Sequence, residues 1–243
     1  LKETNKKLKS DMEKEREQEK KRMEFFAASS HELKTPVTIL KGQIEGMIEG
    51  VGSYKDRDKS LLRAKEVTET LQDMVQEILM ISKMEASGFI LKKADTDMAE
   101  LFRIQLADLT PLFEEKHMKM EVHLPESLKC KVDAALMEKV IRNILVNAVR
   151  YSPKGEKIYI RLFQEENSVT GQVENFGVQI PSEKIDKIFD AFYRVDTSRN
   201  SRSGGSGLGL YIVREILELH EASYKIENTA SGVQFTFQFF SEK

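Results

Sequence analysis

Residues 138–153 read EKVIRNILVNAVRYSP, and this stretch predicts one amphipathic helix. Its apolar residues recur at helical spacing and form a packing face: Val140, Ile141, Ile144, Leu145 and Ala148. Asn143 and Asn147 are four residues apart and therefore share a second face. Asparagine is a poor helix former, so this pair is unexpected on a helix without a reason. Two carboxamides on one face can bind a hydrated Mg²⁺ ion and phosphate oxygens, since Mg²⁺ prefers oxygen ligands.

Two glycine-containing segments follow this helix. Residues 173–181, VENFGVQIP, come directly after a predicted strand, and residues 204–210, GGSGLGL, open an apolar helix. Residues 188–194, IFDAFYR, lie between them. Glycines at such positions let backbone amides approach a phosphate at a helix N-terminus. Taken alone, a glycine-rich turn is weak evidence, because it could be only a tight turn.

Upstream, residues 30–36 read SHELKTP. Residues spaced by alternating fours and threes predict a helix with a buried two-per-heptad seam: Phe26, Ser30, Leu33, Val37, Leu40, Ile44, Met47 and Val51. His31 lies on the flank of this seam and should meet solvent. Glu32 can hydrogen-bond one ring nitrogen and leave the other nucleophilic, and Thr35 shares the face of His31. An isolated His–Glu pair, however, is usually an ordinary surface pair.

Residues 50–53 interrupt this helix, and a second helix is expected after them. Its apolar stripe contains Val67, Leu71, Met74, Ile78 and Ile81. One hairpin cannot bury both stripes well, whereas two hairpins can do so as a dimeric four-helix bundle. Residues 1–23 are highly charged and form either a solvated helix or a connecting coiled coil.

After a linker at residues 86–88 the pattern becomes mixed α/β. Strands are expected at 89–93, 118–124, 129–133, 157–163, 168–175, 223–228 and 233–240. Helices are expected at 97–116, 134–149, 182–187 and 207–220. Residues 194–206 form a long polar loop, which in a compact domain is usually functional or disordered.

Composition excludes several classes of protein. The net charge of −2 gives no electrostatic reason to expect nucleic acid. Cys130 is the only cysteine, so an internal disulfide and a thiolate zinc site are excluded. The chain has no apolar run of membrane-spanning length. It starts at Leu1, so we read it as a fragment, and a membrane anchor of the parent protein would lie outside it.

The order and spacing of these segments resemble the sensor histidine kinase family of bacterial two-component systems. The segments correspond to its phosphoacceptor box, asparagine box, first glycine box, phenylalanine box and second glycine box, and the resemblance covers residues 24–240. It implies an α + α/β fold, with a helical-hairpin dimerisation domain followed by an ATP-binding sandwich of the gyrase and chaperone type. The expected domains are a connecting helix at 1–23, the phosphotransfer hairpin at 24–86 and the catalytic domain at 89–243.

The resemblance also implies roles for individual residues. Those placed around ATP are Asn143, Asn147, Arg150, Tyr151, Asn175, Gly177, Ile180, Arg199, Arg202, Gly205, Gly207, Leu208 and Gly209. Asn147 would bind Mg²⁺, with Asn143 beside the phosphates. Tyr151 would stack on adenine and Arg150 would approach a phosphate. Residues 194–206 would form a lid that brings two arginine charges to the triphosphate.

The implied reaction is ATP-dependent phosphorylation of His31, with Glu32 as acid/base. The phosphoryl group would then pass to an Asp of a response-regulator receiver domain. Thr35 would orient a water molecule for dephosphorylating that partner. The implied assembly is a homodimer on the cytoplasmic side of the membrane.

The first glycine box departs from the family pattern, which has Asp at the position of Asn175 and Gly at that of Gln179. Asn175 can still accept a hydrogen bond from the adenine amino group but carries no charge, and a charge-assisted bond is about twice as strong. If the backbone needs a positive φ at residue 179, glutamine is strained there by about 1–2 kcal/mol. These departures are the only support for the alternative of a weak pseudokinase or phosphatase dimer. The intact Asn147, Gly205, Gly207 and Gly209 weigh against it. A simple ATPase is disfavoured, because Asn143 replaces the water-activating Glu of ATPase relatives and cannot take a proton.

Overall fold

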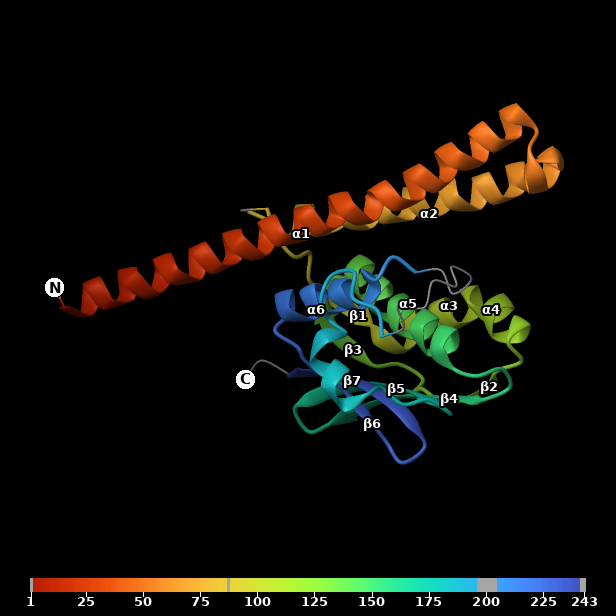
Figure 1. The fold of residues 1–243 in the computed structure, drawn as a ribbon. Coiled ribbons are helices and arrows are strands. Elements are labelled where there is room, and N and C mark those ends of the chain that lie inside the picture. The colour runs from red at the N-terminus through yellow and green to blue at the C-terminus, as the bar shows by residue number, and fades with distance from the viewer. Residues whose placement is uncertain (1, 87, 196–204, 241–243) are drawn as a thin grey trace. The chain divides into compact units, whose positions relative to one another are not determined.

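The computed structural model describes residues 2–86, 88–195 and 205–240 (Figure 1). The chain forms two compact units, Leu1–Leu79 and Met80–Lys243. Within the described residues no helix is both long enough and apolar enough to cross a bilayer.

The first unit is a helical hairpin. Helix α1 (Lys2–Glu49) continues through Pro36, and α2 (Arg57–Met84) follows a short 3₁₀ turn, η1 (Gly52–Lys55). Gly50 ends α1 with a φ of 66°, a conformation that glycine adopts without steric cost. The two expected helices and the break between them are therefore present.

Within one chain the hairpin buries only part of each helix. Phe25 and Ser29 of α1 and Ala64 and Met74 of α2 are buried. By contrast, 49% of Val37 is exposed within one chain, so burial of its seam in a dimeric four-helix bundle stays a prediction. The apolar side chains that remain exposed on the hairpin include Phe26, Val37, Ile44, Ile48, Val51, Leu61, Val75 and Leu79. We call this set the exposed stripe, because the hairpin leaves these side chains uncovered within one chain.

The second unit contains a five-stranded mixed sheet in the order β2-β4-β5-β7-β6. Its strands are β2 (Lys119–His123), β4 (Lys157–Glu165), β5 (Ser168–Phe176), β6 (Ser223–Asn228) and β7 (Gly232–Phe240). β2 pairs with β4 in parallel, and the other pairs are antiparallel. A separate two-stranded ribbon joins β1 (Ala94–Asp97) to β3 (Lys129–Val132).

Helices cover one face of this sheet (Figure 1). They are α3 (Met98–Asp108), α4 (Thr110–Glu115), α5 (Ala134–Tyr151) and α6 (Gly209–Leu219), and a 3₁₀ turn, η2 (Ser182–Lys187), follows β5. Phe102 of α3 stacks on Phe237 of β7 with ring centroids 6.4 Å apart, so the layers share one core. The expected α/β sandwich is confirmed.

Two element boundaries differ from the sequence prediction. The first strand lies at Ala94–Asp97, and residues 89–93 are not a strand. The predicted helix 97–116 is divided at Leu109 into α3 and α4. Pro111 lies in the first turn of α4 and has no N–H to continue the hydrogen bonds of α3, which explains the break.

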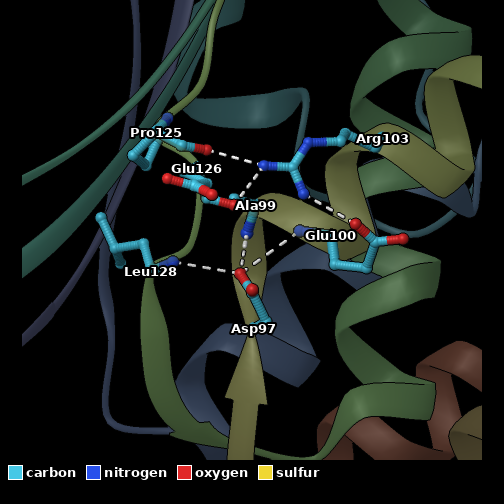
Figure 2. Close-up of polar contacts among 7 residues, drawn as sticks. All are labelled: Asp97, Ala99, Glu100, Arg103, Pro125, Glu126 and Leu128. Atoms are coloured by element: carbon cyan, nitrogen blue, oxygen red, sulfur yellow. Dashed lines mark hydrogen bonds and ion pairs between the residues drawn. The ribbon is translucent and has the colours of Figure 1, made fainter.

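Asp97 connects α3 to the ribbon (Figure 2). Its Oδ1 accepts hydrogen bonds from the N–H groups of Ala99 at 3.0 Å, Glu100 at 3.3 Å and Leu128 at 3.1 Å. The Leu128 bond is the largest of the influences that lower the pKa of this carboxyl from 3.8 to about 2. Asp97 is therefore both the N-cap of α3 and a tie between distant segments.

Replacing Asp97 with Ala should lower the free energy of unfolding of this unit by about 1–2 kcal/mol at neutral pH, because three N–H groups lose their acceptor. The folded-state pKa is depressed, so this stabilisation is present above the unfolded pKa and is lost as pH falls toward 2. Denaturant titrations from neutral pH down to about pH 2 should show the difference between parent and variant shrinking. Asp95→Ala, an exposed change in the same strand, is the control. An equal loss in both variants would contradict the capping role.

Candidate nucleotide-binding and phosphoacceptor sites

Helix α5 presents the two predicted carboxamides. Asp133 caps its N-terminus by accepting a hydrogen bond from Leu136 N–H at 3.4 Å, and its apolar face is buried in the core. Asn143 and Asn147 lie beside that face and are half-buried. Neither side chain makes a hydrogen bond within the described part of the chain, so both retain their donor and acceptor capacity for a ligand.

The N-terminus of α6 faces this pair. A Cβ built on Gly209 would lie 3.7 Å from Asn143 Oδ1 and 3.8 Å from Asn147 Nδ2. No side chain caps α6, so the N–H groups of its first turn remain available. An uncapped N-terminus beside two carboxamides suits a phosphate group accompanied by a hard cation.

The second glycine box packs closely against its surroundings. A Cβ on Gly205 would fall on the guanidinium of Arg150, and one on Gly207 would come within 2.7 Å of Phe192 Cα. Gly207 has a φ of 77°, and its carbonyl accepts a hydrogen bond from Phe192 N–H at 3.0 Å. The asparagine box and the phenylalanine box therefore both contact the second glycine box in the folded structure.

Asn175 lies near the end of β5, on the helix-covered face of the sheet. Its neighbours across the strands are Ile158 and Val233, which are almost fully buried. Directly paired residues point to the same face, so the Asn175 amide projects among apolar side chains. It has no hydrogen-bond partner among the described residues. A polar group in such a place favours a ligand that can hydrogen-bond to it.

The loop after β5 is held by the turn between β6 and β7. Asn228 accepts from Ile180 N–H at 2.9 Å and donates to Ile180 O at 2.7 Å. Gln179 Nε2 donates to Thr229 O at 2.9 Å. Gly177 adopts a φ of 79°, whereas Gln179 is not among the described residues with positive φ. The strain considered for Gln179 is therefore absent, and its side chain anchors the loop instead.

The structure describes only some of the remaining residues predicted to bind the nucleotide. Leu208 is fully buried, and 47% of Tyr151 is exposed at the end of α5. Arg199 and Arg202 lie outside the described residues, as does most of the predicted lid.

His31 projects from α1 with 81% of its side chain exposed. Its Nδ1 lies 3.4 Å from Glu32 Oε1, which leaves Nε2 facing solvent. Thr38 bonds back to the Lys34 carbonyl at 2.8 Å, but Thr35 makes no such bond among the described residues, so its hydroxyl remains available. His31 is thus exposed and has Glu32 at one ring nitrogen, whereas its role as phosphoacceptor stays a prediction.

The donor set fits Mg²⁺ better than zinc. Across the described ranges no group of three or more His, Cys, Asp or Glu side chains could hold a metal ion. The carboxamide oxygens of Asn143 and Asn147 are hard ligands, and Mg²⁺ commonly keeps several waters and is held by few protein groups together with substrate phosphates. The residues present thus fit a Mg²⁺–nucleotide complex.

The sequence did not identify the residues that brace α5. His220 is buried: its Nδ1 pairs with Ile216 O at 2.8 Å, and its Nε2 accepts from Asp133 N–H at 3.0 Å. Burial lowers the pKa of His220, consistent with a neutral ring. Lys116 contacts the other end of α5. These partners are far apart in the sequence, so no local pattern could have indicated them.

Two family models match the chain. Residues 21–87 match the model described as His Kinase A (phospho-acceptor) domain. Residues 132–243 match the model described as Histidine kinase-, DNA gyrase B-, and HSP90-like ATPase.

Curated relatives span both regions. Sensor protein VanSB of Enterococcus faecalis is 33% identical over 97% of this chain and 53% of its own length. Sensor histidine kinase YclK of Bacillus subtilis is 31% identical over 95% of this chain and 49% of its own length. The chain therefore spans about half the length of these relatives.

Solved structures show the same fold. Histidine kinase AdeS of Acinetobacter baumannii has a TM-score of 0.74 at 24% identity, covering 88% of this chain and 98% of that one. Histidine kinase ThkA, solved in complex with response regulator protein TrrA, has a TM-score of 0.73 at 24% identity, covering 90% of this chain and 61% of that one. The two matched models in this order, together with the relatives that share both, show that the chain belongs to the sensor histidine kinases of bacterial two-component systems.

Proposed function

We propose that this chain transfers the γ-phosphoryl group of ATP to His31 and then to an Asp of a response-regulator receiver domain. One observation carries the proposal. A solvent-exposed imidazole with a carboxylate at one nitrogen occurs in the same chain as two unpartnered carboxamides that face an uncapped helix N-terminus. The first is a nucleophile without a phosphate donor, and the second is a phosphate site without a nucleophile. Transfer of a phosphoryl group from a bound nucleotide to His31 requires both the nucleophile and the phosphate site.

In this proposal the second unit binds ATP at α5 and α6. The first-turn N–H groups of α6 donate to phosphate oxygens, and Asn143 lies beside them. Asn147 holds Mg²⁺, which when bound neutralises charge on the phosphates. Arg150, packed on Gly205, adds a fixed positive charge close to the second glycine box.

The base would lie between Asn175 and the exposed ring of Tyr151, with the loop through Gly177 and Ile180 beside it. The amide oxygen of Asn175 can accept from the adenine amino group in its apolar surroundings. Because Gln179 is unstrained and anchored, the departure at this position gives the pseudokinase alternative no support.

The reacting group is His31 Nε2. Its lone pair attacks the γ-phosphorus as the bond from that phosphorus to the bridging oxygen breaks, and the bond's electron pair leaves with ADP. The ring becomes cationic, and the Glu32 carboxylate beside Nδ1 stabilises that charge and can accept its proton.

The finer assignments belong to the same proposal. The hairpin at residues 24–86 is the dimerisation and phosphotransfer domain, residues 89–243 are the catalytic domain, and residues 1–23 connect the hairpin to preceding parts of the protein. ThkA was solved with a response regulator, which supports a receiver domain as the partner. The relatives are named as sensors, which supports a parent protein at the cytoplasmic side of the membrane.

We expect the chain to be a homodimer through the hairpin. The exposed stripe runs along both helices, and a second copy would bury it. Ile44→Glu should weaken the dimer by about 100-fold or more, because two-fold symmetry places the buried charge in the interface twice. Sedimentation equilibrium at micromolar concentration measures this, with Ile90→Glu, an exposed site in the other unit, as control. A monomeric parent chain would contradict the expectation.

Thr35 should act in dephosphorylation of the receiver domain. Its hydroxyl shares the face of His31 and makes no bond to the helix among the described residues. Thr35→Ala should slow loss of phosphate from the phosphorylated receiver roughly tenfold, because a positioned proton donor or acceptor for water is removed. Formation of phospho-His31 should change by less than about twofold. Thr38→Ala is the control, and equal loss of both activities in Thr35→Ala would make Thr35 structural.

A further inference from the structure

The side-chain ammonium of Lys116 donates hydrogen bonds to carbonyl groups at the end of α5. Its Nζ donates to Val149 O at 2.8 Å, Arg150 O at 2.7 Å and Ser152 O at 3.0 Å. The last carbonyls of an α-helix have no partners within the helix, so this ammonium satisfies them directly. It also places a positive charge at the negative end of the helix dipole.

The backbone that carries Lys116 is fixed as well. The chain leaves α4 through His117, which has a left-handed φ of 54°, and Met118 N–H donates to Phe113 O at 2.9 Å. Gly155 N–H donates to Lys116 O at 2.9 Å, so the turn after α5 is bound to the same residue. Lys116 thus holds the end of α5 through both its side chain and its carbonyl.

The surroundings of Lys116 disfavour its charged form, because they lower its pKa. Burial is the largest of the influences that lower its pKa, and the nearby charge of Arg150 lowers it further. Three carbonyl acceptors offset the lost hydration.

Lys116 controls the turn from which two proposed nucleotide ligands project. Arg150 and Tyr151 are the last residues of α5, and the Arg150 guanidinium packs on Gly205. We propose that Lys116 is a positioning residue of the nucleotide site, which fixes the last turn of α5 and thereby the directions of Arg150 and Tyr151. This inference rests on the proposed ATP site.

The chain contains a matched control. The guanidinium of Arg103 in α3 also donates to backbone carbonyls, to Pro125 O at 2.7 Å and to Glu126 O at 2.6 Å (Figure 2). It forms an ion pair with Glu100 as well. It lies in the same unit but holds the segment before β3. Loss of either cation should destabilise the fold, whereas only loss of Lys116 should alter the nucleotide site.

The test compares Lys116→Met and Arg103→Met in the full chain. ATP affinity is measured by calorimetry with Mg²⁺, and the initial rate of labelling by γ-labelled ATP is measured over a range of ATP concentrations. Lys116→Met should raise the Kd and KM for ATP roughly tenfold while kcat stays within about twofold, and Arg103→Met should leave all three within about twofold. An unchanged KM in folded Lys116→Met, or the same rise in both variants, overturns the proposal.

Restoring the cation gives a second, independent readout. Lys116→Arg keeps the charge and should fold and bind ATP more tightly than Lys116→Met. In Lys116→Ala, propylammonium should lower the KM toward that of the parent, and tetramethylammonium, which has no N–H, should not. Absence of both effects overturns the proposal even if Lys116→Met fails to fold. If the parent binds ATP but takes no label, the proposed function fails and the affinities still decide this inference; if the parent binds no ATP, both fail.

Discussion

His31→Ala should abolish ATP-dependent labelling of the chain while leaving its fold and its ATP affinity unchanged. The imidazole is 81% exposed, so its removal exposes no core and leaves no buried group unpaired. The nucleotide site is built entirely from other residues. The expected loss is complete rather than partial, because no neighbouring side chain replaces the attacking nitrogen.

A matched control is available in the second unit. His123 pairs with Glu121 at 3.2 Å and is 56% exposed, so it reproduces the isolated His–Glu pair without the surrounding phosphoacceptor box. His123→Ala should label like the parent. Labelling that persists in His31→Ala, or is lost in His123→Ala, would contradict the assignment of His31 as the phosphoacceptor.

Asn147→Ala should reduce labelling at sub-saturating ATP by about 100-fold or more, the scale seen when one preorganised electrostatic contact to a reacting group is removed. The half-buried carboxamide faces the N-terminus of α6, where the atoms nearest to a Cβ built on Gly209 belong to Asn143 and Asn147. The loss should be partly recovered by raising Mg²⁺, since the affected ligand holds the metal.

Asn167→Ala is the control for that experiment, because Asn167 is exposed at the turn between β4 and β5. ATP affinity and labelling rate are measured for both variants over a range of Mg²⁺ concentrations. A normal rate with normal Mg²⁺ dependence in Asn147→Ala would remove Asn147 from the metal site.

Sequence periodicity predicted the elements with one clear apolar face. Helix α5 was found almost to the residue, because its packing face is continuous and its N-cap is an Asp. Prediction failed where a local rule competes with periodicity, as at Pro111, which divides α3 from α4. The burial of the apolar seam of α1 stays a prediction, because its Val37 and Ile44 are exposed within one chain and only a second copy would cover them.

Residue types indicated which side chains to propose for the site, but they did not indicate the residues that hold those side chains in place. The boxes are short and local, so their chemistry can be read directly from the sequence. The bond from Asp133 to His220 and the bonds from Lys116 to α5 join segments that the fold alone brings together. At Gln179 a rule about glycine suggested strain, whereas the turn from β6 to β7 provides a carbonyl for the glutamine side chain.

The central claim is that ATP places a phosphoryl group on His31, and mass spectrometry of the labelled parent chain tests it most directly. The chain is incubated with Mg²⁺ and ATP labelled at either the γ or the α position, and then digested at alkaline pH. We predict that only the γ label is incorporated, that acid releases it, and that the peptide containing residues 30–36 carries one phosphoryl group on His31. Incorporation that is acid-stable, or that maps to another peptide, would contradict the account.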